Sequence, residues 1–241
     1  CAREDCQRGR INRRDGASCT GSIYRVVGGN SAPGRRLAAE PAAHLGPEIS
    51  LPGAASAQEA TTTAASDVVI NDMYLGEADA PIEVVEYASF TCPHCAHFHA
   101  TVYDQLKANY IDTGKVKFTY REVYFDKFGM WGSMIARCEP TKFFGIADML
   151  YDEQNDWARA GSDGAIADGL RKIGLKAGIG QEQLDACLND GDKLKALVGW
   201  YQENATRDGI DSTPTFLIDG KKYSNMDYDA FAAILDEKLA K

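Results

Sequence analysis

The sequence S-F-T-C-P-H-C-A-H-F-H-A at residues 89–100 decides the fold, because it joins an apolar run to a helical pattern. Proline is tolerated in the first turn of a helix, so Pro93 places Cys92 at the N-cap and Cys95 one turn later on the same face. Free N–H groups and the positive end of the helix dipole favour a thiolate at Cys92, and a cationic His94 adds to this effect. The pattern therefore predicts a strand, a tight turn and a helix that begins with a reactive thiol.

Three kinds of chemistry fit a C-x-x-C pair. A structural zinc site needs two more ligands at a suitable spacing, and no second C-x-x-C or C-x-x-H pair follows. A purely structural disulfide across two residues would constrain the unfolded chain very little. Thiol–disulfide exchange is the favoured interpretation, and a stabilised thiolate at Cys92 predicts a strong oxidant, because it stabilises the reduced protein.

The histidines that follow the motif are a second candidate for metal binding. His97 and His99 could join the two thiols in holding a soft ion such as copper(I). Side chains two residues apart leave a helix about 200° apart, so the two rings cannot hold one ion on one face. We therefore predict solvated or helix-packing histidines and no metal site.

Glu86 stands among the apolar residues of the strand that precedes the motif. A carboxylate on a buried strand face is costly unless it is paired or protonated, which makes Glu86 a candidate functional group. An ion pair with Arg121 or with a lysine of the next strand is the structural alternative.

The rest of the chain continues with recognisable patterns. Apolar and polar residues alternate over residues 115–124, which predicts a strand. This strand completes a strand–helix–strand unit with a right-handed crossover. From residue 125 to about 207 the pattern is helical throughout, with candidate helices at 130–138, 141–151, 163–176, 181–188 and 193–206. Pro214 then heads a strand, Asp219-Gly220 predicts a hairpin, and residues 228–239 form a last amphipathic helix.

The chain resembles the DsbA group of thioredoxin-fold thiol:disulfide oxidoreductases in two places. T-C-P-H-C follows E-Y-A-S-F, and S-T-P-T-F-L-I-D-G lies far downstream. The likeness covers roughly residues 74–241. It implies a thioredoxin-like α/β fold with an inserted all-helical subdomain at about residues 126–207.

The same resemblance implies roles for individual residues. Glu86, six residues before the first cysteine, would handle the proton of Cys95 during exchange. Pro214 would be a cis proline opposite the C-x-x-C motif, where the backbone of Thr213 offers strand-like hydrogen bonds to a substrate peptide. Independently of the resemblance, Cys138 and Cys187 form an even set of thiols in the helical block, and in an exported protein we favour a structural disulfide between them over two buried, inert thiols.

The predicted function is that of an exported, monomeric disulfide oxidase without cofactor. It would donate the Cys92–Cys95 disulfide to reduced, unfolded exported proteins, and the resemblance implies a membrane-bound partner that reoxidises it. Two alternatives stay open: a disulfide isomerase or reductase of the same compartment, and a soft-metal-binding protein that uses the same thiols as ligands.

Composition and the first quarter of the chain limit the possible partners and compartment. The 241 residues carry 26 Lys and Arg against 35 Asp and Glu, a net charge of −9 that argues against nucleic acid. No run of about 18 apolar residues predicts a membrane span. Residues 1–57 lack periodicity, and we predict that they are disordered.

The end of this first segment resembles a processing site. Ala55-Ser56-Ala57 is similar to a signal-peptidase site, which predicts a soluble periplasmic domain at residues 58–241 and an upstream sequence that is not the true leader. A lipid anchor at Cys1 is disfavoured. The pattern assigns no role to Cys1, Cys6 or Cys19.

Overall fold

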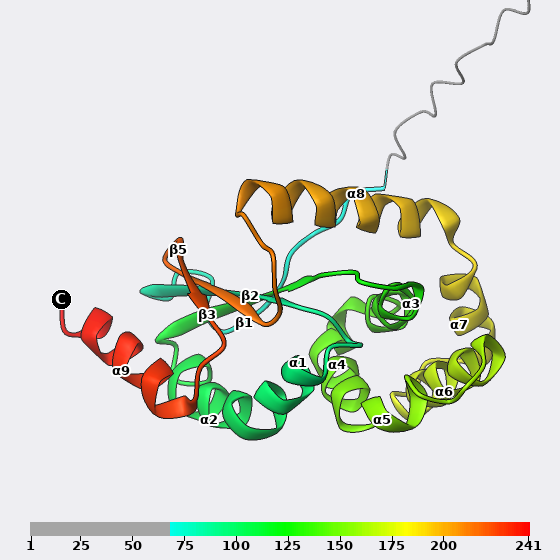
Figure 1. Ribbon diagram of the computed structural model, residues 1–241, viewed down its shortest axis with the longest axis horizontal. Coiled ribbons are helices and arrows are strands. Elements are labelled where there is room, and N and C mark those ends of the chain that lie inside the picture. Colours follow the sequence, from blue (N-terminus) through cyan, green and yellow to red (C-terminus); the bar gives the residue numbers. More distant parts are fainter. Residues whose placement is uncertain (1–67) are drawn as a thin grey trace, which may run out of the picture. The chain divides into compact units, whose positions relative to one another are not determined.

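The computed structural model describes residues 68–241, in which five strands form one mixed sheet (Figure 1). The strands are β1 (Met73–Leu75), β2 (Ile82–Ala88), β3 (Val116–Glu122), β4 (Thr215–Ile218) and β5 (Lys221–Ser224). Their order is β1-β3-β2-β4-β5; β2 and β3 are parallel, and the other neighbours are antiparallel. The predictions for residues 1–57, for Cys1 and for a domain start at residue 58 lie outside the described residues.

One helical segment connects the two parallel strands. It comprises α1 (Pro93–Phe98), the π-helical η2 (His99–Tyr103), α2 (Asp104–Leu106) and the π-helical η3 (Lys107–Ile111). Its buried stripe is the one that helical spacing predicts, namely Phe98, Val102, Leu106 and Tyr110. This stripe packs with α9 (Tyr228–Leu239) on one face of the sheet, whereas α8 (Gly191–Arg207) lies on the other (Figure 1). The two π-helical turns were not predicted.

The sequence between β3 and β4 is entirely helical. Its elements are α3 (Lys127–Ala136), the 3-10 turn η4 (Pro140–Lys142), α4 (Phe143–Asp152), α5 (Gln154–Trp157), α6 (Asp163–Lys176), α7 (Gln181–Leu188) and α8. The predicted thioredoxin-like α/β fold with inserted helices is confirmed. The prediction that the first inserted helix starts at residue 130 was wrong, because the Asp126 side chain accepts hydrogen bonds from the N–H groups of Phe128 and Gly129 and caps the helix earlier.

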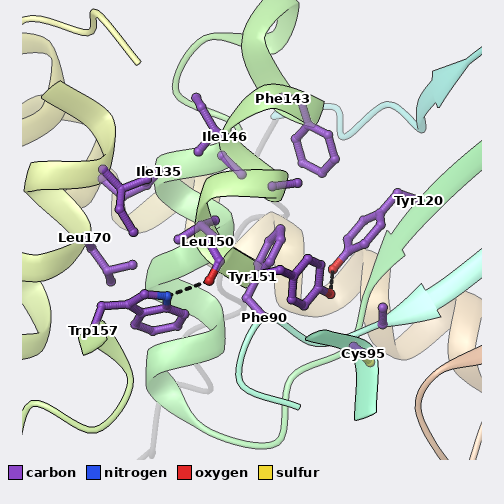
Figure 2. Close-up of a cluster of buried hydrophobic side chains, with 14 of the residues drawn as sticks. Phe90, Cys95, Tyr120, Ile135, Phe143, Ile146, Leu150, Tyr151, Trp157 and Leu170 are labelled. Carbon is purple, nitrogen blue, oxygen red and sulfur yellow. Dashed lines mark hydrogen bonds between the residues drawn. The ribbon is translucent and has the colours of Figure 1, made fainter. Parts of the chain in front are cut away.

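The inserted helices share a hydrophobic core with the end of the sheet. Figure 2 shows Cys95 and Tyr120 on one side of this core, and Trp157 and Leu170 on the other. The indole N–H of Trp157 donates a hydrogen bond of 2.8 Å to the carbonyl of Leu150. The helical block thus packs against the strand ends beside the two motif cysteines. No helix within residues 68–241 has the length and apolar character that a membrane crossing requires.

A disulfide connects two helices within the block. Cys138, just beyond α3, is bonded to Cys187 in α7, and 49 positions separate them in the sequence. A cross-link of this span removes conformational freedom chiefly from the unfolded chain.

We therefore expect the Cys138→Ala/Cys187→Ala variant to unfold more easily. In the chain-entropy model, a loop of 49 positions corresponds to about 4 kcal/mol in the free energy of unfolding. Urea unfolding of this variant and of its parent, both carrying Cys92→Ser and Cys95→Ser, measures the difference. Equal unfolding midpoints would contradict the expectation.

Candidate active site

Cys92 occupies the N-cap of α1, as the proline pattern predicts. Its backbone is extended, with φ −81° and ψ 120°, and Pro93 begins the helix. Both motif cysteines are free thiols, Cys92 with 8% of its surface exposed and Cys95 with none. The side chains of Pro93 and His94 are exposed at the same turn. One sulfur therefore lies at the surface of the site and the other lies beneath it.

The two sulfurs have opposite acid–base properties. A hydrogen bond from the Cys95 thiol, together with the backbone N–H groups of Cys95 and His94, lowers the pKa of Cys92 to about 5 against the opposing effect of burial. Burial raises the pKa of Cys95 far above its ordinary value. At neutral pH the reduced site therefore holds a thiolate at Cys92 and a thiol at Cys95.

The loop before β4 brings a backbone carbonyl to the reactive sulfur. The Thr213–Pro214 peptide bond is cis, and Pro214 is buried. Cys92 Sγ lies 3.5 Å from the carbonyl oxygen of Thr213. The strand that follows pairs with β2 immediately before the motif, with Thr215 opposite Tyr87. The sheet thus holds this loop against the cysteine turn, although 121 positions separate the two contacting residues.

The inserted helices hold the turn by two contacts that the sequence pattern does not reveal. Gln154 of α5 donates from its amide nitrogen to the carbonyl oxygens of Phe90, at 2.8 Å, and Cys92, at 3.0 Å. The Thr91 hydroxyl donates to the carboxylate of Asp126 at 2.8 Å. Both contacts join residues more than thirty positions apart, so no local pattern could have indicated them.

Glu86 is fully buried on β2, and its partner is a histidine. Its Oε2 atom lies 3.1 Å from Nε2 of His99. The predicted alternative partner, Arg121, binds Asp72 and Asp208 instead. The structural alternative, an ion pair of Glu86 with Arg121 or with a lysine of the next strand, is therefore wrong.

Sequence reasoning considered His99 as a metal ligand or a packing residue and did not identify it as the partner of Glu86. The ring stacks on Tyr151, with centroids 4.2 Å apart, so it is packed as predicted, but it also binds Glu86. His97 is exposed. His99 follows Cys95 by four residues and so shares its buried helix face, and this spacing was the signal that could have identified it.

A pair of buried phenols borders the inner sulfur. The hydroxyls of Tyr120 and Tyr151 are 2.6 Å apart (Figure 2). Tyr120 lies opposite Glu86 in the register of β2 and β3. Burial raises the pKa of both tyrosines well above the ordinary value, so both stay protonated. Within the part of the chain that the structure describes, no three His, Cys, Asp or Glu side chains cluster as metal ligands would.

Known proteins resemble this chain in sequence over the same region. The family model described as Thioredoxin matches residues 69–237. A putative protein-disulfide oxidoreductase of Rickettsia bellii (strain RML369-C) is 32% identical, over 70% of this chain and 65% of its own length. Disulfide bond formation protein D of Bacillus subtilis (strain 168) is 27% identical, over 68% of this chain and 76% of its own length. This chain therefore spans a little less than two thirds of the Rickettsia relative.

Solved structures agree with this similarity. Wolbachia pipientis alpha-DsbA1 superposes with a TM-score of 0.63 at 27% identity, covering 70% of this chain and 92% of that protein. Oxidised BdbD from Bacillus subtilis gives a TM-score of 0.60 at 26% identity, covering 70% of this chain and 94% of that protein.

The inner thiol should control the acidity of the outer one. Because the hydrogen bond from Cys95 is the largest influence that lowers the pKa of Cys92, we expect Cys95→Ala to raise that pKa from about 5 toward its ordinary value. Cys95→Ser, which keeps a donor, should raise it less. The ultraviolet absorbance of the thiolate, followed against pH, measures both. An unchanged pKa in Cys95→Ala would show that the N-cap position alone sets the acidity.

Proposed function

Because this chain belongs to the thioredoxin family, we propose that it is a DsbA-type thiol:disulfide oxidoreductase that donates the Cys92–Cys95 disulfide to reduced proteins. The observation that carries the proposal is the contrast between the two sulfurs, with the pKa of Cys92 lowered to about 5 and that of Cys95 raised by burial. A site that stabilises its own reduced form transfers its disulfide readily.

The proposed reaction proceeds through a mixed disulfide. A substrate thiolate attacks Cys92 Sγ, so a bond to the substrate sulfur forms while the Cys92–Cys95 bond breaks and its electron pair passes to Cys95. Cys95 takes up a proton, because burial raises the pKa of this thiol. A second substrate thiolate then attacks the substrate sulfur, and Cys92 leaves as a thiolate. The substrate loses two electrons and the cysteine pair gains them.

Glu86 is the proposed group that exchanges a proton with Cys95. The carboxyl group has no exposed surface, and its negative charge adds to the high pKa of Cys95. Its Oε1 atom has no hydrogen-bond partner among residues 68–241, so one oxygen is free to accept or give a proton. Such a group lets the inner sulfur change between thiol and thiolate without contact with bulk solvent.

The loop at Thr213 and Pro214 is the proposed docking site for substrate. The carbonyl oxygen of Thr213 lies 3.5 Å from Cys92 Sγ. An extended substrate peptide would pair with the backbone of Thr213 there as an added strand. Unfolded proteins suit this mode of binding, because they offer free backbone groups. The exposed His94 and Pro93 border the same turn and would contact the incoming chain.

The proposed compartment is the periplasm, where the protein would act as a soluble monomer. The Cys138–Cys187 disulfide supports an oxidising environment, because such bonds rarely persist in the cytosol. A membrane-bound partner would accept the electrons and restore the oxidised site. Disulfide bond formation protein D of Bacillus subtilis and a probable protein of that name in Bacillus cereus are similar to this chain, which supports a role in disulfide formation.

The low pKa of Cys92 sets the expected shift of the reduction potential. With a pKa of about 5, the thiolate favours the reduced, folded protein by ~2.7 kcal/mol at pH 7. For a two-electron couple this free energy corresponds to a reduction potential more positive by ~60 mV.

The decisive experiment is the redox equilibrium of the Cys92–Cys95 pair with glutathione, followed by oxidation of a reduced peptide. We expect a potential well above that of a reducing thioredoxin and stoichiometric peptide oxidation. Cys92→Ser should abolish peptide oxidation, and Cys95→Ser should accumulate the mixed disulfide. A strongly reducing potential would favour a reductase, and tight copper(I) binding without peptide oxidation would favour a metal-binding protein.

The potential should also depend on pH in two regimes. Above about pH 5 reduction consumes one proton, because Cys92 stays a thiolate, whereas below about pH 5 it consumes two. The midpoint potential should therefore fall by ~30 mV per pH unit above this value and by ~60 mV per unit below it. Redox titrations across this range locate the break. A single slope of ~60 mV per unit up to about pH 8 would mean that Cys92 has an ordinary acidity.

A further inference from the structure

The Glu86–His99 pair is a buried polar contact beside the site, and it does not contribute to the low pKa of Cys92. Glu86 has no exposed surface and His99 has 7% exposed, while their side chains meet at 3.1 Å. Each partner keeps one unpaired atom among residues 68–241, Oε1 of Glu86 and Nδ1 of His99. Unsatisfied polar atoms in a buried pair cost free energy, so their retention indicates a task.

The fold places this pair on the buried side of the helical segment that carries the inner sulfur, near enough for the charge of Glu86 to raise the pKa of Cys95. Cys95 and His99 are four residues apart on one helical segment and therefore share its buried face. The regular α-helical turns end at Phe98, and the π-helical turn η2 begins at His99. Such widened turns occur frequently at functional sites. Glu86 faces the segment from β2, the central strand of the sheet.

Within residues 68–241, aromatic rings surround the His99 ring on several sides. Tyr151 of α4 stacks on it at 4.2 Å, Tyr103 of η2 packs at 4.5 Å, and Tyr120 of β3 presents an edge at 6.3 Å. Burial raises the pKa of all three phenols, so they stay neutral. Glu86 is therefore the charged group that the ring contacts in the interior.

On its outer side His99 borders a pocket at the surface, with 7% of the residue exposed. A pocket of about 330 Å³ is lined by His99, Ala100, Tyr103, Asp104, Asp148 and Asp152. Desolvation by the surrounding protein raises the pKa of Asp148, with Asp104 and Asp152 adding to the effect and with His99 and Lys107 opposing it. This carboxyl group can therefore exchange protons with solvent closer to neutral pH than an ordinary aspartate can.

We propose that His99 holds the proton that Glu86 exchanges with Cys95, and that it connects this buried carboxyl group with the acidic pocket at Asp148. The inference rests on the proposed exchange chemistry of Cys92 and Cys95. Imidazole suits the task, because each of its two ring nitrogens can take up or release a proton. His99 is a positioning residue, because it acts on the sulfur through Glu86.

The proton balance of the step is simple. When a thiolate opens the Cys92–Cys95 bond, the electron pair goes to Cys95 and the carboxyl group of Glu86 gives that sulfur a proton. Glu86 is reprotonated from His99, and His99 is reprotonated from the pocket. One thiolate and one proton are consumed, and one mixed disulfide and one thiol are formed. Reoxidation runs the same transfers in reverse.

The test compares His99→Gln with His97→Gln, an exposed histidine of the same helical segment. The measured step is the attack of Cys95 on a glutathione mixed disulfide at Cys92, followed as glutathione release between about pH 5 and pH 8. We expect His99→Gln to slow this step by about tenfold or more at neutral pH and to flatten its pH profile, while His97→Gln follows the parent. In the Glu86→Gln background the His99 substitution should add nothing. A His99→Gln variant with the parental rate and pH profile would overturn the inference.

Two further measurements remove ambiguity. The ultraviolet titration of Cys92 should be unchanged in His99→Gln, which separates proton handling from damage to the helix. If that variant does not fold, the ring nitrogen signals of His99 in the unmodified protein should differ between the oxidised and reduced forms at neutral pH, more than those of His97. Equal signals in both forms would contradict the inference.

These measurements do not depend on a protein substrate. If glutathione exchanges at Cys92 but no peptide is oxidised, the proposed oxidase function fails and the effect of His99 is still measured. If peptides are oxidised and His99→Gln matches the parent, the inference about His99 fails alone.

Discussion

The site is organised around an electrostatic difference between two sulfur atoms, those of Cys92 and Cys95, which are one helical turn apart. Cys92 is surrounded by hydrogen-bond donors at the start of a helix, and Cys95 is enclosed by the core. The first environment stabilises an anion, and the second excludes one. Neither effect would survive if the turn between strand and helix were loose, because the donors must point at one sulfur while the apolar wall covers the other.

The inserted helices provide this rigidity. The side chain of Gln154 donates hydrogen bonds to two backbone carbonyls of the turn. The Asp126 carboxylate accepts a hydrogen bond from the Thr91 hydroxyl and also caps the N-terminus of α3. The same block supplies Tyr151, which stacks on the His99 ring and forms a hydrogen bond with the hydroxyl of Tyr120 on β3. A thioredoxin-like sheet with its single crossover helix would leave this side of the motif open. In this protein the helical block is therefore part of the site, and its packing fixes the geometry of the cysteine turn.

Local rules predicted much of this arrangement. The N-cap position of Cys92 follows from the adjacent proline, and the buried stripe that starts at Phe98 follows from helical spacing. The contacts of Gln154 and the partner of Glu86 could not be predicted, because they depend on how helices pack across the end of the sheet. The sequence offered several cations as partners for the buried carboxylate, and only tertiary packing selects His99 rather than Arg121. The π-helical turns likewise arise from packing, since no proline or glycine marks them.

The Cys138–Cys187 disulfide has a consequence for the maturation of newly synthesised protein. In each newly made chain the thiols of Cys138 and Cys187 must be oxidised to a disulfide before the protein reaches its full stability. The new chain is therefore itself a substrate for the reaction that we propose for the folded protein. Finished molecules would then speed the maturation of later ones. A cell that begins with few copies would therefore accumulate the cross-linked protein slowly at first and faster afterwards.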